Sequence, residues 1–188
     1  MNEELASAKI LPLLIRLTIP ATAAQLVNAL YSIVDRMYIG HMPGDGTLAL
    51  SAIGLTYPIT MLVAALSCLP GMGGAPLASI ALGKGEVGRA QKYLCNALTM
   101  LLAISVIMTA GCLIFLRPLL ILFGADHSTL PYASQYLTIY LLGTVFVELS
   151  LGLNPFINTQ GYTFIGTMSV VIGAVINIVL DPILIYVL

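Results

Sequence analysis

Five long apolar segments take up most of this chain of 188 residues and decide which folds are open to it. A helix that crosses a membrane needs about 20 mostly apolar residues, and each segment reaches that length. The segments comprise residues 11–40, 51–82, 94–123, 132–155 and 163–188. We therefore predict an all-α fold: a polytopic transmembrane helix bundle of about five spans, forming a single transmembrane domain over residues 1–188.

The composition places this bundle in a lipid bilayer. Hydrophobic residues make up 59% of the chain and charged residues 8%, whereas soluble domains carry about 25% charged residues. The formal net charge of -1 gives no indication of a nucleic-acid partner. The cysteines, Cys68, Cys95 and Cys112, lack the spacing of a disulfide framework or a zinc site, so we interpret them as small apolar side chains.

Prolines and glycines interrupt the apolar segments. A helix of about 30 residues is roughly 45 Å long, more than a hydrocarbon core about 30 Å thick, so the spans should tilt, kink or project. Pro20, Pro58, Pro70 and Pro76 are the predicted kinks, because proline lacks a backbone donor. Between Pro70 and Pro76, glycines should also let a neighbouring helix approach closely.

Basic residues set the predicted orientation. Lys9 and Arg16 lie at the start of the first segment, and Lys84, Arg89 and Lys92 crowd the linker after the second. Short loops rich in Lys and Arg stay in the cytoplasm. We predict a multi-pass protein of the inner cell membrane with a cytoplasmic N-terminus. The last apolar segment has no polar exit, so we expect the fifth span, or the protein, to be unfinished.

The linker GKGEVG, residues 83–88, satisfies the G-x-G-x-x-G pattern of dinucleotide-binding proteins. That motif works only between a strand and the N-terminus of a helix that holds the pyrophosphate. Here the pattern follows an apolar helix and forms a basic turn. We therefore predict no nucleotide site and no cofactor.

Polar residues form a stripe on the first segment. Thr18, Gln25, Asn28, Ser32 and Asp35 recur at spacings of three, four or seven, which keeps them along one side of a helix. This stripe must face protein or water, because hydrocarbon cannot satisfy hydrogen-bonding groups. The amides and hydroxyls have two open roles: they hold helices together, or they line a binding site.

Asp35 is the most informative member of the stripe. A charge near the bilayer centre costs about 2.5 to 3.5 kcal/mol, so intramembrane acids usually have a function. Arg36 does not neutralise it directly, because adjacent helical residues point about 100° apart. We expect Arg36 to extend to the outer interface.

A second polar site lies in the fifth segment. Asn177 and Asp181 are four residues apart on one helical face, and Pro182 loosens the helix just after the acid. Counted from the cytoplasmic ends, Asp35 lies roughly 35 Å along its helix and Asp181 roughly 27 Å along its own. Both belong to the outer half, so we predict that these two carboxylates are neighbours.

Glu148 belongs to a helix that enters from outside and lies roughly 24 Å along it, in the inner half. We therefore expect it to be distant from Asp35 and Asp181. Two interpretations stay open at this point: a functional acid, or a buried acid paired with Tyr140 or Thr144 on its own face.

Four stretches carry a resemblance to a known family: VDRMYIG, LGKGEVGRAQKY, INTQGYT and INIVLDPILI. Together they resemble the multidrug and toxic compound extrusion (MATE) transporters, in particular the prokaryotic branch. The resemblance implies two six-helix bundles, of which this chain is the incomplete N-terminal lobe of five helices, and the C-terminal lobe is absent. It also implies a secondary active antiporter, not an enzyme, that exports organic cations in exchange for H+ or Na+.

The resemblance assigns the cation and substrate site to Asp35, Asn177 and Asp181, with Asn28 and Ser32 as neutral ligands. The two acids would alternate between protonated and ionised pairs, and their oxygens also suit a sodium ion. Many relatives have Arg at the position of Asn158, so we expect that linker to contact substrate or lipid differently. Alone, the chain should not transport, because its second half, or a second copy, is missing.

Two alternative functions remain. An intramembrane aspartyl protease needs two acids that share a proton, but its Gly-x-Gly-Asp motif is absent from this sequence. A flippase of lipid-linked saccharides would line its cavity with basic residues, and here Arg36 is the only basic candidate within a span.

Overall fold

A computed structural model describes residues 10–42 and 44–186 of the chain. These residues form helices joined by short turns, with no strand among them, so the predicted all-α fold is confirmed. The helices are α2 (Ile10–Gly40), α3 (Gly46–Gly83), α4 (Val87–Ile114), α5 (Leu116–Leu122), α6 (Leu130–Leu142), α7 (Thr144–Thr159) and α8 (Thr163–Tyr186).

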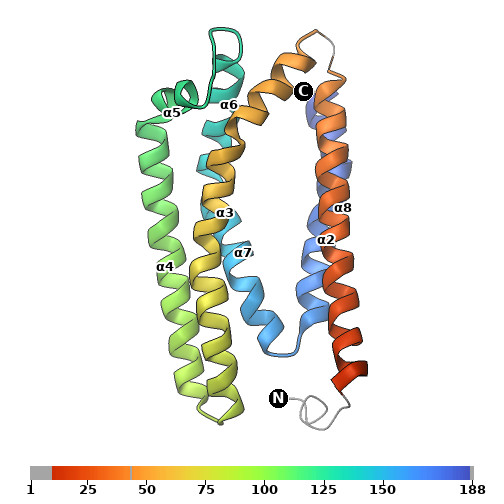
Figure 1. Ribbon diagram of the computed structural model, residues 1–188, viewed down its shortest axis with the longest axis vertical. Helices are drawn as coiled ribbons and strands as arrows, with labels where there is room; N and C mark the ends of the chain where they lie inside the picture. The colour runs from red at the N-terminus through yellow and green to blue at the C-terminus, as the bar shows by residue number, and fades with distance from the viewer. Residues whose placement is uncertain (1–9, 43, 187–188) are drawn as a thin grey trace.

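Several of these helices can cross a membrane. By length and composition, α3, α4 and the part of α8 over Thr163–Leu180 qualify among the described residues, and α6 with α7 adds a fourth, bent span. The remaining predicted segment is α2, a helix of 31 residues that runs along the same long axis (Figure 1). The polytopic bundle expected from the apolar segments is therefore present.

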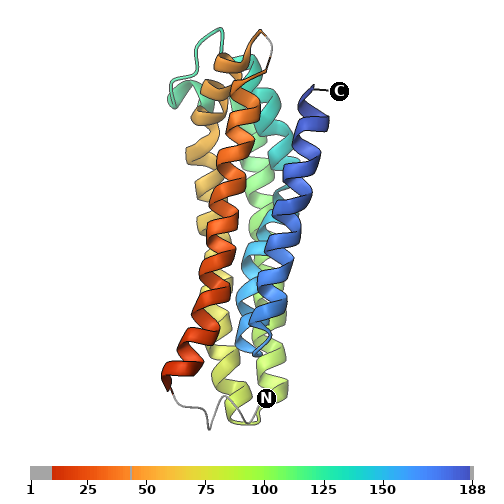
Figure 2. The ribbon, with the colours of Figure 1, turned by 90° about the vertical axis from the view of Figure 1, so that its right-hand side faces the viewer.

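The helices gather into two groups. α3 packs against α4, α6 and α7, whereas α2 packs mainly against α8. Figure 1 shows the α2–α8 pair standing apart from the other helices, and Figure 2 shows the two helices side by side. The α2–α3 turn and the α7–α8 turn connect the two groups at opposite ends. A site on α2 is therefore held by α8 along its length and by α3 near its end.

The linker GKGEVG, which was predicted to form a turn, joins α3 directly to α4. Gly85 has a φ of 78°, a left-handed conformation that favours glycine. α4 begins at Val87, and a helix rather than a strand precedes the turn. The context required for a dinucleotide site is therefore absent from this stretch.

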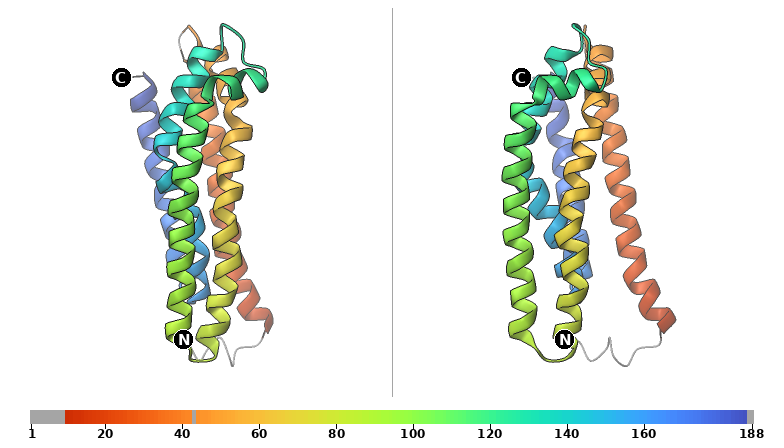
Figure 3. Two further views of the ribbon diagram at one scale, coloured as in Figure 1. Left: turned by 90° about the vertical axis from the view of Figure 1, so that its left-hand side faces the viewer. Right: turned by 60° about the vertical axis from the view of Figure 1, so that its left-hand side comes forward.

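The predicted third span, residues 94–123, is two helices instead of one. α4 ends at Ile114 and α5 begins at Leu116, and Figure 3 shows α5 lying across the end of the bundle. Pro118 explains the break, because in a continuous helix its ring would clash with the carbonyl of Ile114, four residues earlier. The sequence contained this signal, but the prediction did not use it.

The predicted fourth span, residues 132–155, is also broken. α6 and α7 meet at Gly143 with a bend of 55°. Next to the bend, the hydroxyl of Thr109 on α4 donates a hydrogen bond of 2.9 Å to the carbonyl oxygen of Leu141. This bond gives an acceptor at the end of α6 a partner on another helix, so the break is stabilised by tertiary structure.

The prolines predicted as kinks do not interrupt α3. Pro58, Pro70 and Pro76 all lie inside this continuous helix, although Figure 1 shows α3 changing direction in its first half. The side chain of Pro20 lies outside the described ones. The predicted close approach is confirmed at Gly71, where a Cβ atom would lie 2.6 Å from the carbonyl oxygen of Gly152 on α7.

The core of the larger group contains two apolar clusters, with several buried polar residues between them. One apolar cluster comprises Ala52, Ile59, Cys112, Leu120, Ala133, Leu137 and Leu141. The other comprises Ala75, Ala78, Ala81, Ala90, Ala97 and Phe156. Between them along the helices lies a polar belt of buried residues, Ser67, Ser105, Thr144 and Glu148. Cys112 is packed as the small apolar side chain that was predicted.

Candidate functional site

The predicted polar stripe of α2 divides into a covered and an open part. Asn28, Ser32 and Asp35 are half-buried, whereas Thr18 and Gln25 are exposed. The covered part lies in the second half of the helix, toward the α2–α3 turn. Three of the predicted site residues are therefore brought together on one partly covered face.

A tyrosine on another helix lies within electrostatic range of Asp35. Tyr136 of α6 is close enough to Asp35, Tyr31 and Arg36 of α2 for electrostatic interaction. The acid thus interacts with the protein across the space between the two groups of helices. Sequence reasoning did not include Tyr136 in the site.

Arg36 has a partner on α3. Its guanidinium carbon lies 5.9 Å from the ring centroid of Tyr57, which is within the range of a cation–π interaction. Both side chains are exposed. The prediction had Arg36 extending to the outer interface, and the structure adds an aromatic contact that bridges α2 and α3.

An apolar pocket of about 250 Å³ opens at the same end of the bundle. Its wall comes from the end of α2, the start of α3 and one face of α6: Ile39, Met42, Ala49, Ile53, Tyr132, Gln135, Tyr136 and Ile139. The hydroxyl of Tyr132 donates a hydrogen bond to the carboxylate of Asp45 in the α2–α3 turn. Tyr136 therefore belongs both to this pocket and to the surroundings of Asp35.

The tyrosines of α6 had a signal in the sequence. Tyr132, Tyr136 and Tyr140 recur at every fourth position, which places them along one helical face. The rings of Tyr136 and Tyr140 stack, with centroids 6.4 Å apart and an interplanar angle of 19°. This spacing is the pattern that identified the polar stripe of α2, and it was present in a segment analysed only for its acid.

The other predicted half of the site lies on α8. Asn177 is exposed, and the side chain of Asp181 lies outside the described ones. Because α2 and α8 pack along each other, the two acidic positions belong to neighbouring helices. The close approach of the Asp35 and Asp181 carboxylates stays a prediction. So does a sodium ion between them, because the side chain of Asp181 is not among those described.

Glu148 does not have the partner proposed for it. The residue is fully buried, and neither carboxylate oxygen has a hydrogen-bond partner among the described residues. The interpretation that Tyr140 or Thr144 pairs with it is wrong. The hydroxyl of Thr144 donates instead to the backbone carbonyl of Tyr140, at 3.3 Å.

Asn158 takes part in the connection between α7 and α8. Its side-chain amide donates to the Oδ1 atom of Asn154 at 3.1 Å, and the amide of Asn154 donates to the carbonyl of Gly166 at 3.3 Å. A Cβ atom on Gly166 would lie 2.6 Å from Oδ1 of Asn158. The structure therefore gives Asn158 a hydrogen bond at the turn that leads into α8.

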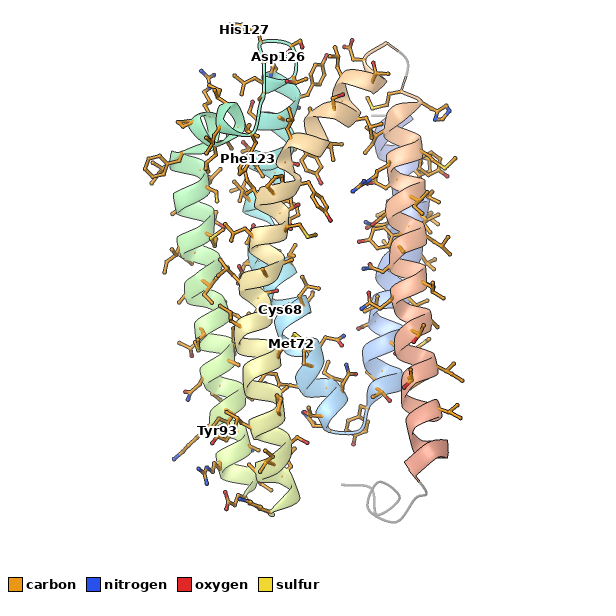
Figure 4. The ribbon with its side chains drawn as sticks, in the orientation of Figure 1. Cys68, Met72, Tyr93, Phe123, Asp126 and His127 are labelled. Atoms are coloured by element: carbon orange, nitrogen blue, oxygen red, sulfur yellow. The ribbon has the colours of Figure 1, made fainter. Side chains whose placement is uncertain are left out.

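The loop before α6 closes the same end of the bundle as the pocket. Figure 4 shows Asp126 and His127 at the end where α2 ends and α3 begins, and Tyr93 near the opposite end. The carboxylate of Asp126 accepts hydrogen bonds from the backbone amide and hydroxyl of Thr129, both at 2.8 Å, and from the hydroxyl of Ser128 at 2.7 Å. These bonds hold the pKa of Asp126 well below its usual range.

Comparison with known proteins identifies relatives among transporters. The MatE family model matches residues 20–183. An FAD transporter of Shewanella oneidensis is 28% identical over 182 residues, which cover 97% of this chain and 40% of that protein. The multidrug export protein MepA of Staphylococcus haemolyticus is 31% identical over 169 residues, which cover 90% of this chain and 37% of that protein.

Solved structures agree with the sequence comparisons. A MATE protein crystallised in complex with MaD3S has a TM-score of 0.85 and 26% identity, covering 93% of this chain and 38% of that one. A MOP superfamily transporter from Pyrococcus furiosus gives the same TM-score, identity and coverage. The chain thus spans 37% to 40% of the length of these curated relatives, which fits the predicted N-terminal portion of such a transporter.

Proposed function

This chain belongs to the MatE family, and on that premise we propose that it forms part of a secondary active antiporter that exports organic cations in exchange for H+ or Na+. Its relatives are transporters rather than enzymes, so the chain is not an enzyme and the aspartyl protease alternative falls away. The proposed location is the inner cell membrane, with the N-terminus in the cytoplasm.

The surroundings of Asp35 are the observation that carries this proposal. The half-buried acid interacts with Tyr136, which also lines an apolar pocket. A carboxylate within range of a tyrosine that lines an apolar pocket suits a lipophilic cation, because the acid supplies the charge and the ring supplies cation–π attraction. An anionic substrate would need basic groups instead.

The proposed exchange depends on the charge of Asp35. An ionised carboxylate attracts the organic cation, and a proton or sodium ion arriving from outside neutralises the acid and releases the cation. Asn28 and Ser32, which share its face of α2, would supply neutral ligands, and Asn177 and Asp181 would contribute from α8. Only binding that differs between the two states drives exchange.

The chain covers less than half the length of its relatives, and this affects the activity of residues 1–188 alone. Alternating access in such transporters moves one repeat or bundle against another around a fixed site. We expect export to require the rest of a family-length protein or a second copy of the chain. In isolation, these residues supply one wall of the site.

A transport assay tests the assignment of Asp35. The protein as cells make it is reconstituted into proteoliposomes, and export of a fluorescent organic cation is driven by a proton or a sodium gradient. Asp35→Asn should abolish export, because Asn keeps the shape of a protonated Asp but cannot ionise. Asp126→Asn is the matched control: the same change in an exposed loop, where the Oδ1 atom of Asn can still accept the hydrogen bonds from Ser128 and Thr129. Equal activity of both variants would rule out the role of Asp35.

A flavin dinucleotide is the second candidate substrate. A relative matched over 97% of this chain is named an FAD transporter, and Arg36 with Tyr57 offers a cation beside an exposed aromatic ring. These groups suit the phosphates and the planar ring of a flavin. In the same proteoliposomes, FAD export that is lost in Arg36→Gln and kept in Asp35→Asn would favour this substrate over an organic cation.

A further inference from the structure

The burial of Glu148 conflicts with a negative charge on it. The side chain has no exposed surface, and both carboxylate oxygens lack hydrogen-bond partners among the described residues. An ionised carboxylate in such a place has neither water nor donors to stabilise it, which is strongly unfavourable. The cation-exchange site around Asp35 makes no use of this acid.

Three helices meet one turn away from Glu148. On α7, Gly152 lies against the backbone of Gly71 on α3, with a Cβ at Gly71 only 2.6 Å from the Gly152 carbonyl oxygen. The side chain of Leu101 on α4 covers the same glycine, because a Cβ at Gly152 would lie 2.5 Å from its Cδ2 atom. This contact fixes the relative heights of α3, α4 and α7.

Two serines lie at the level of Glu148, one helical turn away from this contact. α3 and α7 run in the same direction and α4 runs oppositely (Figure 1). Ser67 lies four residues before Gly71 on α3, and Glu148 lies four residues before Gly152 on α7. Ser105 lies four residues after Leu101 on α4. Each of these residues therefore lies on the helix face that makes the contact. Ser67 and Glu148 are 0% exposed and Ser105 is 1% exposed.

Both serines can accept a hydrogen bond. The hydroxyl of Ser67 donates to the carbonyl of Ala64 at 2.7 Å, and that of Ser105 donates to the carbonyl of Leu102 at 2.9 Å. Their hydrogens are therefore used within their own helices, whereas the hydroxyl oxygens keep lone pairs. Such oxygens suit the O–H of a protonated carboxyl better than the oxygens of an ionised one.

No cationic side chain faces Glu148 from α3 or α4. α3 contains no Asp, Glu, Lys, Arg or His, and its Tyr57 and Cys68 are exposed. The cations of α4, Arg89 and Lys92, lie in its first turns, with Lys92 roughly 20 Å along the helix from Ser105. The remaining ionisable side chains of α4 are Tyr93 and Cys95, near the same end, and Cys112 in an apolar cluster.

The other helices packed on α7 bring no cation either. α6 contributes Tyr140, which is close enough to Glu148 for electrostatic interaction, and next to it Tyr136. The charged residue of α8 is an acid, Asp181. Among the described residues, no cationic side chain can pair with Glu148, which favours a proton as its partner, and a metal ion would need several oxygen ligands around it.

We propose that Glu148, with the hydroxyls of Ser67 and Ser105, forms a proton-binding site in the polar belt of the α3–α4–α7 core, separate from the site at Asp35. In this site Glu148 is neutral, and a rotation of its side chain lets its O–H group donate a hydrogen bond to the hydroxyl oxygen of one of the two serines. Tyr136 is within electrostatic range of Asp35, and Tyr140, on which it stacks, is within range of Glu148. The proposal depends on packing within the bundle and holds whether or not the transported substrate is an organic cation.

Infrared spectroscopy of the protein in lipid nanodiscs tests the proposal. At neutral pH the wild type should show the C=O stretching band of a protonated carboxyl, and the band should move in deuterated water. The band should be lost in Glu148→Gln, which keeps the volume and a neutral group, and kept in Asp35→Asn. An unchanged band in Glu148→Gln would overturn the proposal, as would conversion to an ionised carboxylate on addition of Na+.

The serines provide an independent measurement if Glu148→Gln does not fold. Removing both acceptors in Ser67→Ala/Ser105→Ala should move the same band to a higher frequency, because the carboxyl loses its hydrogen bond. Thr99→Ala, which removes an exposed hydroxyl of α4, is the control and should leave the band in place. A band at the same frequency in the double variant would show that the serines do not accept the proton, and the site would be rejected.

Discussion

Gly71 of α3 and Gly152 of α7 bring the backbones of two helices into direct contact. A Cβ atom on Gly71 would lie 2.6 Å from the carbonyl oxygen of Gly152, closer than a side chain can approach backbone. Neither helix can relieve this overlap by turning a side chain. Packing at this point therefore depends on the absence of a side chain on α3.

Gly71→Ala should separate α3 from α7 and destabilise the protein by about 1 to 3 kcal/mol, as overpacking a close-packed core does. Thermal unfolding in detergent measures the effect. Gly73→Ala is the matched control, since a Cβ there meets nothing within 4 Å and alanine favours a helix by about 0.5 to 1 kcal/mol. Equal melting temperatures for the two variants would contradict the contact.

The orientation can be tested with cysteines on a background lacking Cys68, Cys95 and Cys112. His127 lies in the loop before α6 and Lys84 in the α3–α4 turn, so the two exposed residues are at opposite ends of the bundle (Figure 1). A reagent that cannot cross the membrane should label His127→Cys in intact cells, and Lys84→Cys only after the membrane is opened, because basic loops stay in the cytoplasm. The reverse pattern would place the N-terminus outside.

The all-α bundle and the linkers between its apolar segments were predictable from the sequence, because apolar length and turn residues are local signals. The breaks were not predicted, for two different reasons. Pro118 was a local signal that went unused, whereas the bend at Gly143 is stabilised by the bond from Thr109 to Leu141, which joins residues 32 positions apart. A local pattern cannot reveal such a partner.

In the candidate site too, local features were predictable from the sequence, whereas contacts between helices were not. The 3.6-residue period placed Asn28, Ser32 and Asp35 on one face of α2, and that face is partly covered. The approach of Tyr136 depends on how α6 packs relative to α2, which the sequence does not specify locally. For Glu148, the search for partners stayed on its own helix, and there Thr144 uses its hydroxyl for a backbone carbonyl.

The stability of the protein should depend on pH through Asp126. Hydrogen bonds from the backbone and hydroxyl of Thr129, followed by Ser128, lower the pKa of this carboxyl in the folded state, whereas an unfolded Asp titrates near about 3.9. The stabilisation is therefore complete above about pH 5 and is lost as the pH falls through the unfolded value toward the folded one. Asp126→Ala should lower the melting temperature at pH 7 and have less effect at pH 3. An equal decrease in melting temperature at both pH values would show that the carboxylate charge is not responsible.

The last prediction ranks three acids by their effect on transport in the protein as cells make it. Asp35→Asn should abolish proton-driven or sodium-driven export, because the acid interacting with Tyr136 can no longer change its charge. Asp181→Asn should reduce export at least about tenfold, equivalent to about 1.4 kcal/mol, if the acids on the paired helices α2 and α8 titrate together. Glu148→Gln should be milder, since this acid lies in the core of the other helix group, away from the pocket wall.

Initial rates of fluorescent-cation export in proteoliposomes, normalised to the amount of inserted protein, give the order. An Asp181→Asn variant with wild-type rates would separate the two acids, and a Glu148→Gln variant as inactive as Asp35→Asn would mean that the buried proton site is required for coupling itself.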